Sequence, residues 1–291
     1  MSNTTTSLRR KIDGAKDLRS VVRTMKAVSA SSIGQYEESV RALADYYQSV
    51  KLGLGACLRS ETNAINFSGS THRSHSIDAV IFGSDQGLVG QFNDIIADHA
   101  VKKLANLPGE VRVWAVSERV HACLVDYGFP MQALFELPST VQGIVPLVGH
   151  ILVESMHWRK QDDSAQLYLF YNRPRSAAVF SPHMQRLLPL DEKWLGNLVE
   201  HPWPSQRFSQ VIGEGTMTLQ ALINEYLFIS IFRACAESLA SENASRLKAM
   251  QRADKNIDEL LTDLGRNYHR LRKDGIDAEL FDVIAAYDSL Q

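Results

Sequence analysis

The sequence predicts an α/β fold that combines a long antiparallel coiled coil of N- and C-terminal helices with a central, Rossmann-like and mainly parallel α/β domain. Three observations carry this prediction: proline-free chain ends, heptad-spaced apolar residues within those ends, and alternating strand and helix patterns between them. All nine prolines lie between Pro108 and Pro204. A helix of about 75 residues would be about 110 Å long, whereas a compact domain of this length is roughly 50 Å across. Such a helix must find a partner for its apolar side.

The C-terminal segment, residues 205–291, is predicted to form one arm of the coiled coil. Its apolar residues follow a heptad seam that Asp254 alone interrupts. The seam consists of Leu247, Met250, Ile257, Leu261, Leu264, Tyr268 and Leu271. Seams of this kind are buried against another helix by knobs-into-holes packing.

The N-terminal segment, residues 1–60, is predicted to supply the second arm. Its seam consists of Ala15, Leu18, Val22 and Met25, and, after a serine-rich stretch, of Leu43, Tyr46 and Val50. Ser7 is expected to be the N-cap of this helix. Two long helices at opposite ends of a chain most simply pair antiparallel. An ordinary helical bundle is the alternative, and the length of the helices counts against it.

The middle segment, residues 76–190, is predicted to form the α/β domain. Strands are expected at residues 78–82, 111–116, 132–135 and 166–171, and helices at residues 93–104, 118–127 and 141–158. This alternation is typical of a mainly parallel sheet covered by helices. Pro182 and Pro189 restrict residues 176–190 to an edge strand. Tryptophan, proline and glycine residues predict a loop-rich connection over residues 191–215.

Composition indicates a soluble globular protein of the cytoplasm. The chain is 45% hydrophobic and 22% charged, with a net charge of −2, and it has no run of about 18 apolar residues that could span a membrane. The polar N-terminus lacks the apolar core of a signal peptide. The three cysteines are far apart and form no CxxC motif, which favours free thiols in a reducing compartment.

The basic N-terminal helix does not predict a nucleic-acid-binding protein. Residues 1–26 carry seven lysines and arginines against two aspartates, so this helix could contact nucleic acid, anionic lipid or an acidic protein surface. A solvated helix face is the commonest reason for such a charge run. The acidic balance of the whole chain and the lack of interleaved aromatic residues disfavour nucleic acid.

No catalytic, cofactor or metal site is expected. The loop at residues 83–90 follows a strand but lacks both GxGxxG spacing and a GK[ST] motif. The nine histidines include no HExxH motif. Ser84, Asp85 and His121 could in principle form a hydrolytic site. The sequence has no GxSxG elbow, however, so we expect no hydrolytic site there.

Several segments together resemble the gamma subunit of F-type ATP synthases. Residues 10–30, notably TMKAV at 24–28, resemble the opening helix of that family, and GSDQGLVGQFN at 83–93 resembles its loop after the first strand. Residues 241–250 and 276–286 resemble the family's C-terminal helix and its end signature. The order and spacing of these segments cover nearly the whole chain.

The departures from the family pattern indicate a divergent member. Gln86 stands where the family usually has arginine, Val89 where it has cysteine, and Gln91 where it has glycine. Asp277 and Ala285 replace the threonine and glycine of the end signature. Such drift resembles the alternate, sometimes sodium-linked, branch of the family.

The resemblance implies a non-catalytic, central-stalk rotor subunit that transmits torque between ion transport and ATP synthesis or hydrolysis. Its implied partners are the alpha and beta subunits, the epsilon subunit and the membrane c-ring, and its implied location is peripheral, on the cytoplasmic face of the cell inner membrane without insertion. The runner-up is a non-enzymatic coiled-coil adaptor with an α/β docking domain. Co-purification with alpha and beta chains would distinguish the two.

The resemblance also implies which residues contact partners. Met25, Lys26 and Arg246 are expected near the beta-subunit levers, and the tail around Ile276, Glu279 and Ile284 in the upper bearing. Gln86, Val211, Ile212 and Glu214 are expected towards the c-ring and the epsilon subunit. If Met25 lies level with Met250, facing residue numbers add up to about 275, which would place Leu18 against Ile257 and leave residues after about 270 unpaired.

Overall fold

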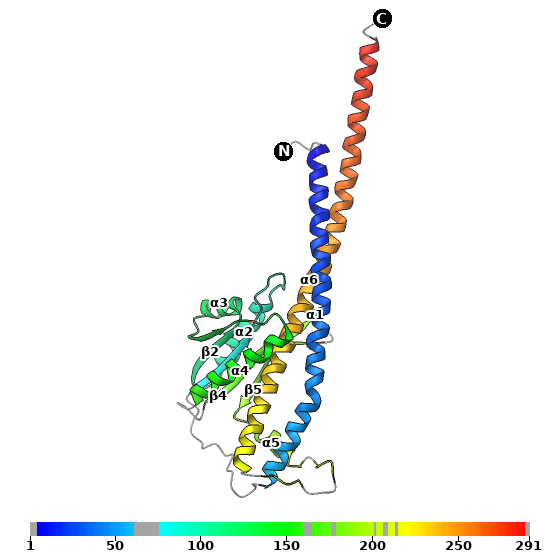
Figure 1. Ribbon diagram of the computed structural model, residues 1–291. Coiled ribbons are helices and arrows are strands. Elements are labelled where there is room, and N and C mark those ends of the chain that lie inside the picture. Colours follow the sequence, from blue (N-terminus) through cyan, green and yellow to red (C-terminus); the bar gives the residue numbers. More distant parts are fainter. Residues whose placement is uncertain are drawn as a thin grey trace. The chain divides into compact units, whose positions relative to one another are not determined.

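The computed structural model describes residues 5–60, 76–159, 165–175, 179–200, 202–205, 209–212 and 215–288. Figure 1 shows a sheet covered by helices, and two long terminal helices. The chain divides into two compact units: residues 1–30 with 246–291, and residues 31–245. The boundaries of these units differ from those of the three expected segments, 1–60, 76–190 and 205–291, because each long helix contributes to both units.

The long helices are α1, Thr5–Ser60, and α6, Gly215–Asp288. Neither contains a proline, the residue that most strongly breaks a helix interior. Because α1 begins at Thr5, Ser7 lies inside its first turn and is not the expected N-cap. None of the described helices has both the length and the apolar character needed to cross a membrane.

The sheet has five strands in the order β3-β2-β1-β4-β5. They are β1 Ser76–Phe82, β2 Glu110–Val116, β3 Met131–Phe135, β4 Gln166–Pro174 and β5 Phe180–Leu188. The first four run parallel to their neighbours, and β5 pairs antiparallel with β4 at the edge. The mainly parallel sheet with a proline-bearing edge strand is therefore confirmed.

Two helices cover one face of the sheet. They are α2, Phe92–Leu104, and α3, Glu118–Asp126. In β1, Ile77, Ala79 and Ile81 point to this face and are fully buried against both helices. The alternate residues Val80 and Phe82 point to the other face, because side chains in a strand alternate between faces.

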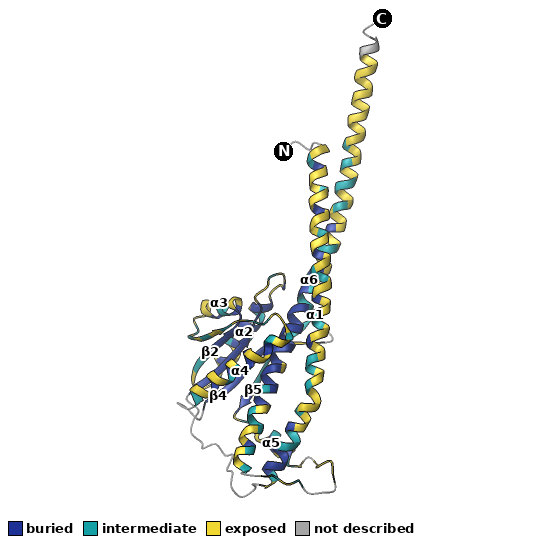
Figure 2. Cartoon of the chain, in the orientation of Figure 1, coloured by how far each residue is buried: buried dark blue, intermediate teal, exposed yellow. Residues whose placement is uncertain are grey.

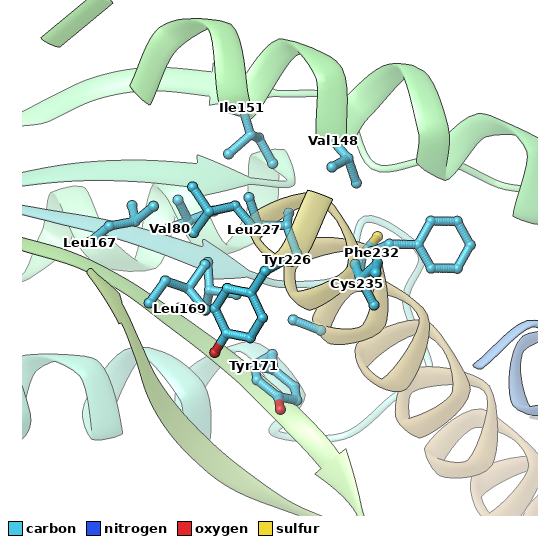
Figure 3. Packing of buried hydrophobic residues seen from close by; sticks show 14 of the residues in the cluster. Val80, Val148, Ile151, Leu167, Leu169, Tyr171, Tyr226, Leu227, Phe232 and Cys235 are labelled. Carbon is cyan, nitrogen blue, oxygen red and sulfur yellow. The ribbon is translucent and has the colours of Figure 1, made fainter. Parts of the chain in front are cut away.

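The other face packs against α4, Val141–Arg159, and against parts of both long helices. Figure 3 shows Val80 and Leu169 of the sheet, Ile151 of α4 and Leu227 of α6 in one apolar cluster. Residues 50–58 of α1 and 219–240 of α6 contribute to the same cluster. The two long helices are thus part of the core of the unit formed by residues 31–245.

Residues 191–215 are not loop throughout, as the sequence had predicted. They contain α5, Glu192–Glu200. The helix forms because Leu195 and Leu198, three residues apart on one face, are buried in the core, and because the Asp191 carboxylate accepts a hydrogen bond from the Lys193 N–H. The nearby tryptophan, prolines and glycines concealed this short amphipathic pattern. Gly55 of α1 allows the approach of α5, since a Cβ there would lie 2.5 Å from the Leu198 carbonyl oxygen.

Candidate functional site

The first candidate surface is the helix pair formed by residues 5–30 of α1 and the part of α6 from residue 246 onwards. Val22, Met250 and Ile257 form a small buried cluster, and Met25 and Leu261 pack against it. The expected level pairing of Met25 with Met250 agrees with this cluster. The pair is antiparallel, because ion pairs join Arg19 to Asp258 and Lys26 to Asp254, so that numbers rise on one helix as they fall on the other.

The seam of α1 contains Ala15, Val22 and Met25, as expected, but not Leu18. Its buried residues recur every seven positions and are Leu8, Ala15, Val22 and Ser29. Ile12, Arg19 and Lys26 are half-buried. They lie four residues after Leu8, Ala15 and Val22, respectively. Leu18 is 53% exposed and does not face Ile257. Arg19 takes the seam position, because Asp254 and Asp258 on the opposite helix attract a cation there.

In the later part of α1, Leu43 and Val50 pack in the apolar core as expected, but Tyr46 does not. Tyr46 was expected in the seam but is exposed, and its hydroxyl donates to Glu225 at 2.7 Å. Tyr47 points inwards instead and stacks on Tyr226, with ring centroids 6.2 Å apart. Apolar spacing alone could not separate two adjacent tyrosines.

Asp254 is the polar centre of the helix pair. Its carboxylate lies 3.3 Å from Lys26 Nζ and 3.6 Å from the Nε atoms of Arg19 and Arg23. Partial burial raises the pKa of Asp254, but the hydrogen bond from Lys26 and the charges of all three cations outweigh it, so that the net pKa is below its ordinary value. Asp254 is therefore a carboxylate at neutral pH. The sequence showed the seam interruption and the basic helix separately, and only the antiparallel register brings them together.

The second candidate surface is the end of α6, which continues beyond the last contacts of the pair. Every described side chain from residue 272 to residue 285 is exposed (Figure 2). The exposed apolar side chains are Ile276, Leu280, Phe281, Val283 and Ile284. Ile276, Glu279 and Ile284, which were expected to contact partners, all lie on this bare tail. The expectation that residues after about 270 lack a partner within the chain is confirmed for the described residues.

The third candidate surface is the loop after β1, residues 83–91. Its backbone is fixed from three sides. Asn93 of α2 binds the N–H and the carbonyl of Ser84, at 2.8 and 3.0 Å, and Asp85 accepts the Glu118 N–H of α3 at 2.8 Å. Ser245 of α6 donates to the Val89 carbonyl at 2.9 Å. The side chain of Gln86 is exposed on this loop.

This loop lies where doubly wound sheets place their ligands. Strand order reverses between β1 and β4, and such folds bind nucleotides at the carboxyl ends of the strands beside the reversal. Here the loop after β1 is hydrogen-bonded to α6 at that edge. This position of the fold is thus used for attachment of the long helix.

The remaining expected contact residues differ in exposure. Val211 is half-buried and Ile212 is 89% exposed, whereas Glu214 lies outside the described residues. Arg246 is only 5% exposed. The expected contact residues thus fall on several separate surfaces, and the residues that sequence reasoning missed are Arg19 and Arg23, whose signal was the aspartate in an apolar seam.

Comparisons with known proteins agree on one family. The model of the ATP synthase family matches residues 4–290. An ATP synthase gamma chain of Geobacter metallireducens is 25% identical over 98% of both chains, and one of Clavibacter michiganensis is 26% identical over 96% of this chain and 95% of its own length. Among solved structures, a chain of the Euglena gracilis mitochondrial ATP synthase OSCP/F1/c-ring superposes with a TM-score of 0.63 at 17% identity, covering 98% of this chain and 94% of its own length. This last likeness is one of fold.

Proposed function

The chain belongs to the family of ATP synthase gamma chains, and from this premise we propose that it is the non-catalytic rotor of the central stalk of an F-type ATP synthase. In this role it transmits torque between ion transport through a membrane ring and ATP synthesis or hydrolysis by the alpha and beta subunits. It acts peripherally, at the cytoplasmic face of the inner membrane.

The observation that carries the proposal is the bare tail of α6. Phe281 and Val283 are 68% and 66% exposed at the end of a helix that has left its partner. The part of α6 from residue 272 onwards is a lone helix, and a lone helix of this length is marginally stable in water. Exposed apolar clusters mark interaction sites. A surrounding collar of partner subunits would cover these side chains.

The chemistry of the tail also suits a bearing. Apolar contact is non-directional, so it allows a shaft to turn in a way that fixed hydrogen bonds would oppose. Glu279 and its acidic neighbours Asp277 and Asp282 make the tail more polar than this simple picture requires, and nothing in the structure explains them.

The other proposed contacts are those that the family resemblance implies. We assign Met25, Lys26 and Arg246 to the beta-subunit levers, and Gln86, Val211, Ile212 and Glu214 to the c-ring and the epsilon subunit. The exposure of Gln86 and Ile212 supports their assignment. Because the side chain of Arg246 is buried, a beta-subunit lever would contact either the residues that cover it or the part of α6 that carries it.

Affinity purification of the tagged full chain from its own cell tests the proposal. A rotor should bring down three alpha and three beta chains for each copy, and the purified assembly should hydrolyse ATP. Recovery of the chain without alpha and beta subunits would exclude a rotor and would favour the adaptor.

A further inference from the structure

A cavity of about 430 Å³ lies within the unit formed by residues 31–245. It is bounded by α1, β4, β5 and α6, and no residue assigned to a partner contact lines it. Its volume falls within the range of about 300–1,000 Å³ that small-molecule sites occupy. The cavity is therefore large enough to hold a small molecule.

Three arginines from three different elements line this cavity: Arg41 of α1, Arg173 of β4 and Arg233 of α6. Among the described residues of its wall there is no carboxylate. Glu237 lies beside the cavity. One of its carboxylate oxygens accepts a hydrogen bond from Nε of Arg233 at 2.7 Å, and the other lies 3.3 Å from Nε of Arg173. One carboxylate thus serves two guanidinium groups.

The cavity consequently carries surplus positive charge. Each of the two ion pairs engages one nitrogen of a guanidinium that has five N–H donors, and Arg41 uses its Nε on the carbonyl of Glu37, one turn earlier in its own helix. The pKa of His183 on the wall is below its ordinary value: burial lowers it most, and the charges of Arg173 and Arg233 lower it further, whereas Glu237 raises it. The imidazole is thus neutral at neutral pH, and the arginines supply the charge.

The rest of the wall can hold the body of a small molecule. Tyr47 and Tyr171 present aromatic rings, and Val40, Leu43 and Ile229 present apolar groups. Polar or charged residues make up about half of the wall, and apolar or aromatic residues the rest.

We propose that this cavity binds a small oxyanion, a phosphate or a polycarboxylate, through Arg41, Arg173 and Arg233. The planar guanidinium fork matches carboxylate and phosphate oxygens in pairs. The site goes beyond the rotor function and does not depend on it. Because its three cations come from α1, β4 and α6, a bound anion would join these elements and stabilise the unit that contains them.

Calorimetry and thermal unfolding of the full chain test the proposal, with inorganic phosphate and citrate as separate probes against sodium chloride of equal ionic strength. We expect saturable heat with a Kd below about 1 mM for at least one probe, and a Tm that rises with its concentration. Saturation by phosphate alone would assign a phosphate site, and saturation by citrate a carboxylate site. Absence of saturation by both probes at about 10 mM would overturn the proposal.

Two variants show whether the anion binds in this cavity. Arg41→Gln removes a cation that has no part in the Glu237 pairs, and Arg173→Gln leaves the shorter pair between Arg233 and Glu237 intact. Each should weaken binding about tenfold or more, as expected for loss of a hydrogen bond to a charged group. Arg10→Gln, at an exposed arginine on the same helix outside the cavity, should leave the Kd unchanged. Equal affinity in all three variants would place the anion elsewhere and overturn the proposal.

Discussion

Asp254 interrupts the apolar seam of α6, and three cations of α1 surround it. A polar residue at such a position lowers stability but fixes the register of a coiled coil, because any shift would leave its charge unpaired. Sliding of α1 by one heptad would move Arg19, Arg23 and Lys26 away from Asp254. The cluster therefore resists slippage between the two helices of a shaft under torque.

Asp254→Asn should lower the Tm of the isolated chain at pH 7, because it leaves three neighbouring cations without their shared counter-charge. The folded-state pKa of Asp254 is below its ordinary value, so its stabilising effect is complete above the ordinary value of about 4 and is lost as the pH falls through the folded-state value. The Tm difference between wild type and variant should therefore shrink as the pH falls below 4.

Asp263→Asn is the matched control, because Asp263 is an exposed aspartate on the same helix, three residues from its partner Arg266. An exposed pair of this kind contributes little, so its Tm should stay close to that of wild type. A Tm difference for Asp254→Asn that persists undiminished at pH 2 would contradict an electrostatic role.

Arg246→Glu tests the assignment of Arg246 to the levers. Since Arg246 is 5% exposed, reversal of its charge should reduce stability and also lower the ratio of ion pumping to ATP hydrolysis in membrane vesicles. Arg246→Lys keeps the charge and should retain most of the stability. An unchanged ratio in an assembled Arg246→Glu complex would count against the assignment.

At the level of helices, proline placement and heptad spacing in the sequence were enough to predict two long paired helices, but not the side chains that face each other. Because leucine is apolar, the sequence predicted that Leu18 lies in the seam. In the structure Arg19 lies there instead, because it pairs with Asp254. The tertiary partner decides between adjacent positions of a helix, and no single-helix pattern contains that information.

A cysteine pair should verify the register of the helices. Val22 and Ala253 belong to one packed cluster, so the double variant Val22→Cys, Ala253→Cys should form a disulfide on mild oxidation. Val22→Cys with Leu260→Cys should not, because Leu260 is 49% exposed and lies about 10 Å farther along the helix, beyond the reach of a disulfide. Crosslinking of the second pair in place of the first would mean a different register.

Substitutions in the bare tail should reduce assembly with partner subunits but leave the stability of the isolated chain nearly unchanged. Ile276→Asn with Ile284→Asn should change the stability of the isolated chain by no more than about 0.5 kcal/mol, as is usual for exposed positions. The same variant should reduce the yield of complex with alpha and beta subunits, because apolar contact to the collar is lost. Wild-type assembly of the double variant would exclude these two residues from the interface.

The sheet was predictable because its buried strands are continuous apolar runs separated by helices, and the prolines of β5 excluded it from the centre. The short helix α5 was missed because Trp194 and nearby prolines and glycines resembled a loop. The candidate site was predictable in part: the tail and Gln86 followed from the family resemblance, whereas the aspartate cluster and the arginine-lined cavity depend on contacts between residues far apart in sequence.

At the level of the whole molecule, the two long helices belong to both compact units. In the unit of residues 31–245 they are part of the sheet's core, and in the other unit they form the helix pair. Each of these helices is continuous, α1 over Thr5–Ser60 and α6 over Gly215–Asp288. This arrangement suits a rotor better than an adaptor, for which a flexible connection would suffice.

Observation of rotation tests this account most directly. A bead attached at Val153→Cys, an exposed position of α4, in a Cys123→Ser background would report motion of the chain in complexes immobilised through their alpha or beta subunits. MgATP should drive continuous rotation of the bead in one direction, and rotation should cease when MgATP is removed. A stationary bead on complexes that hydrolyse ATP would contradict it.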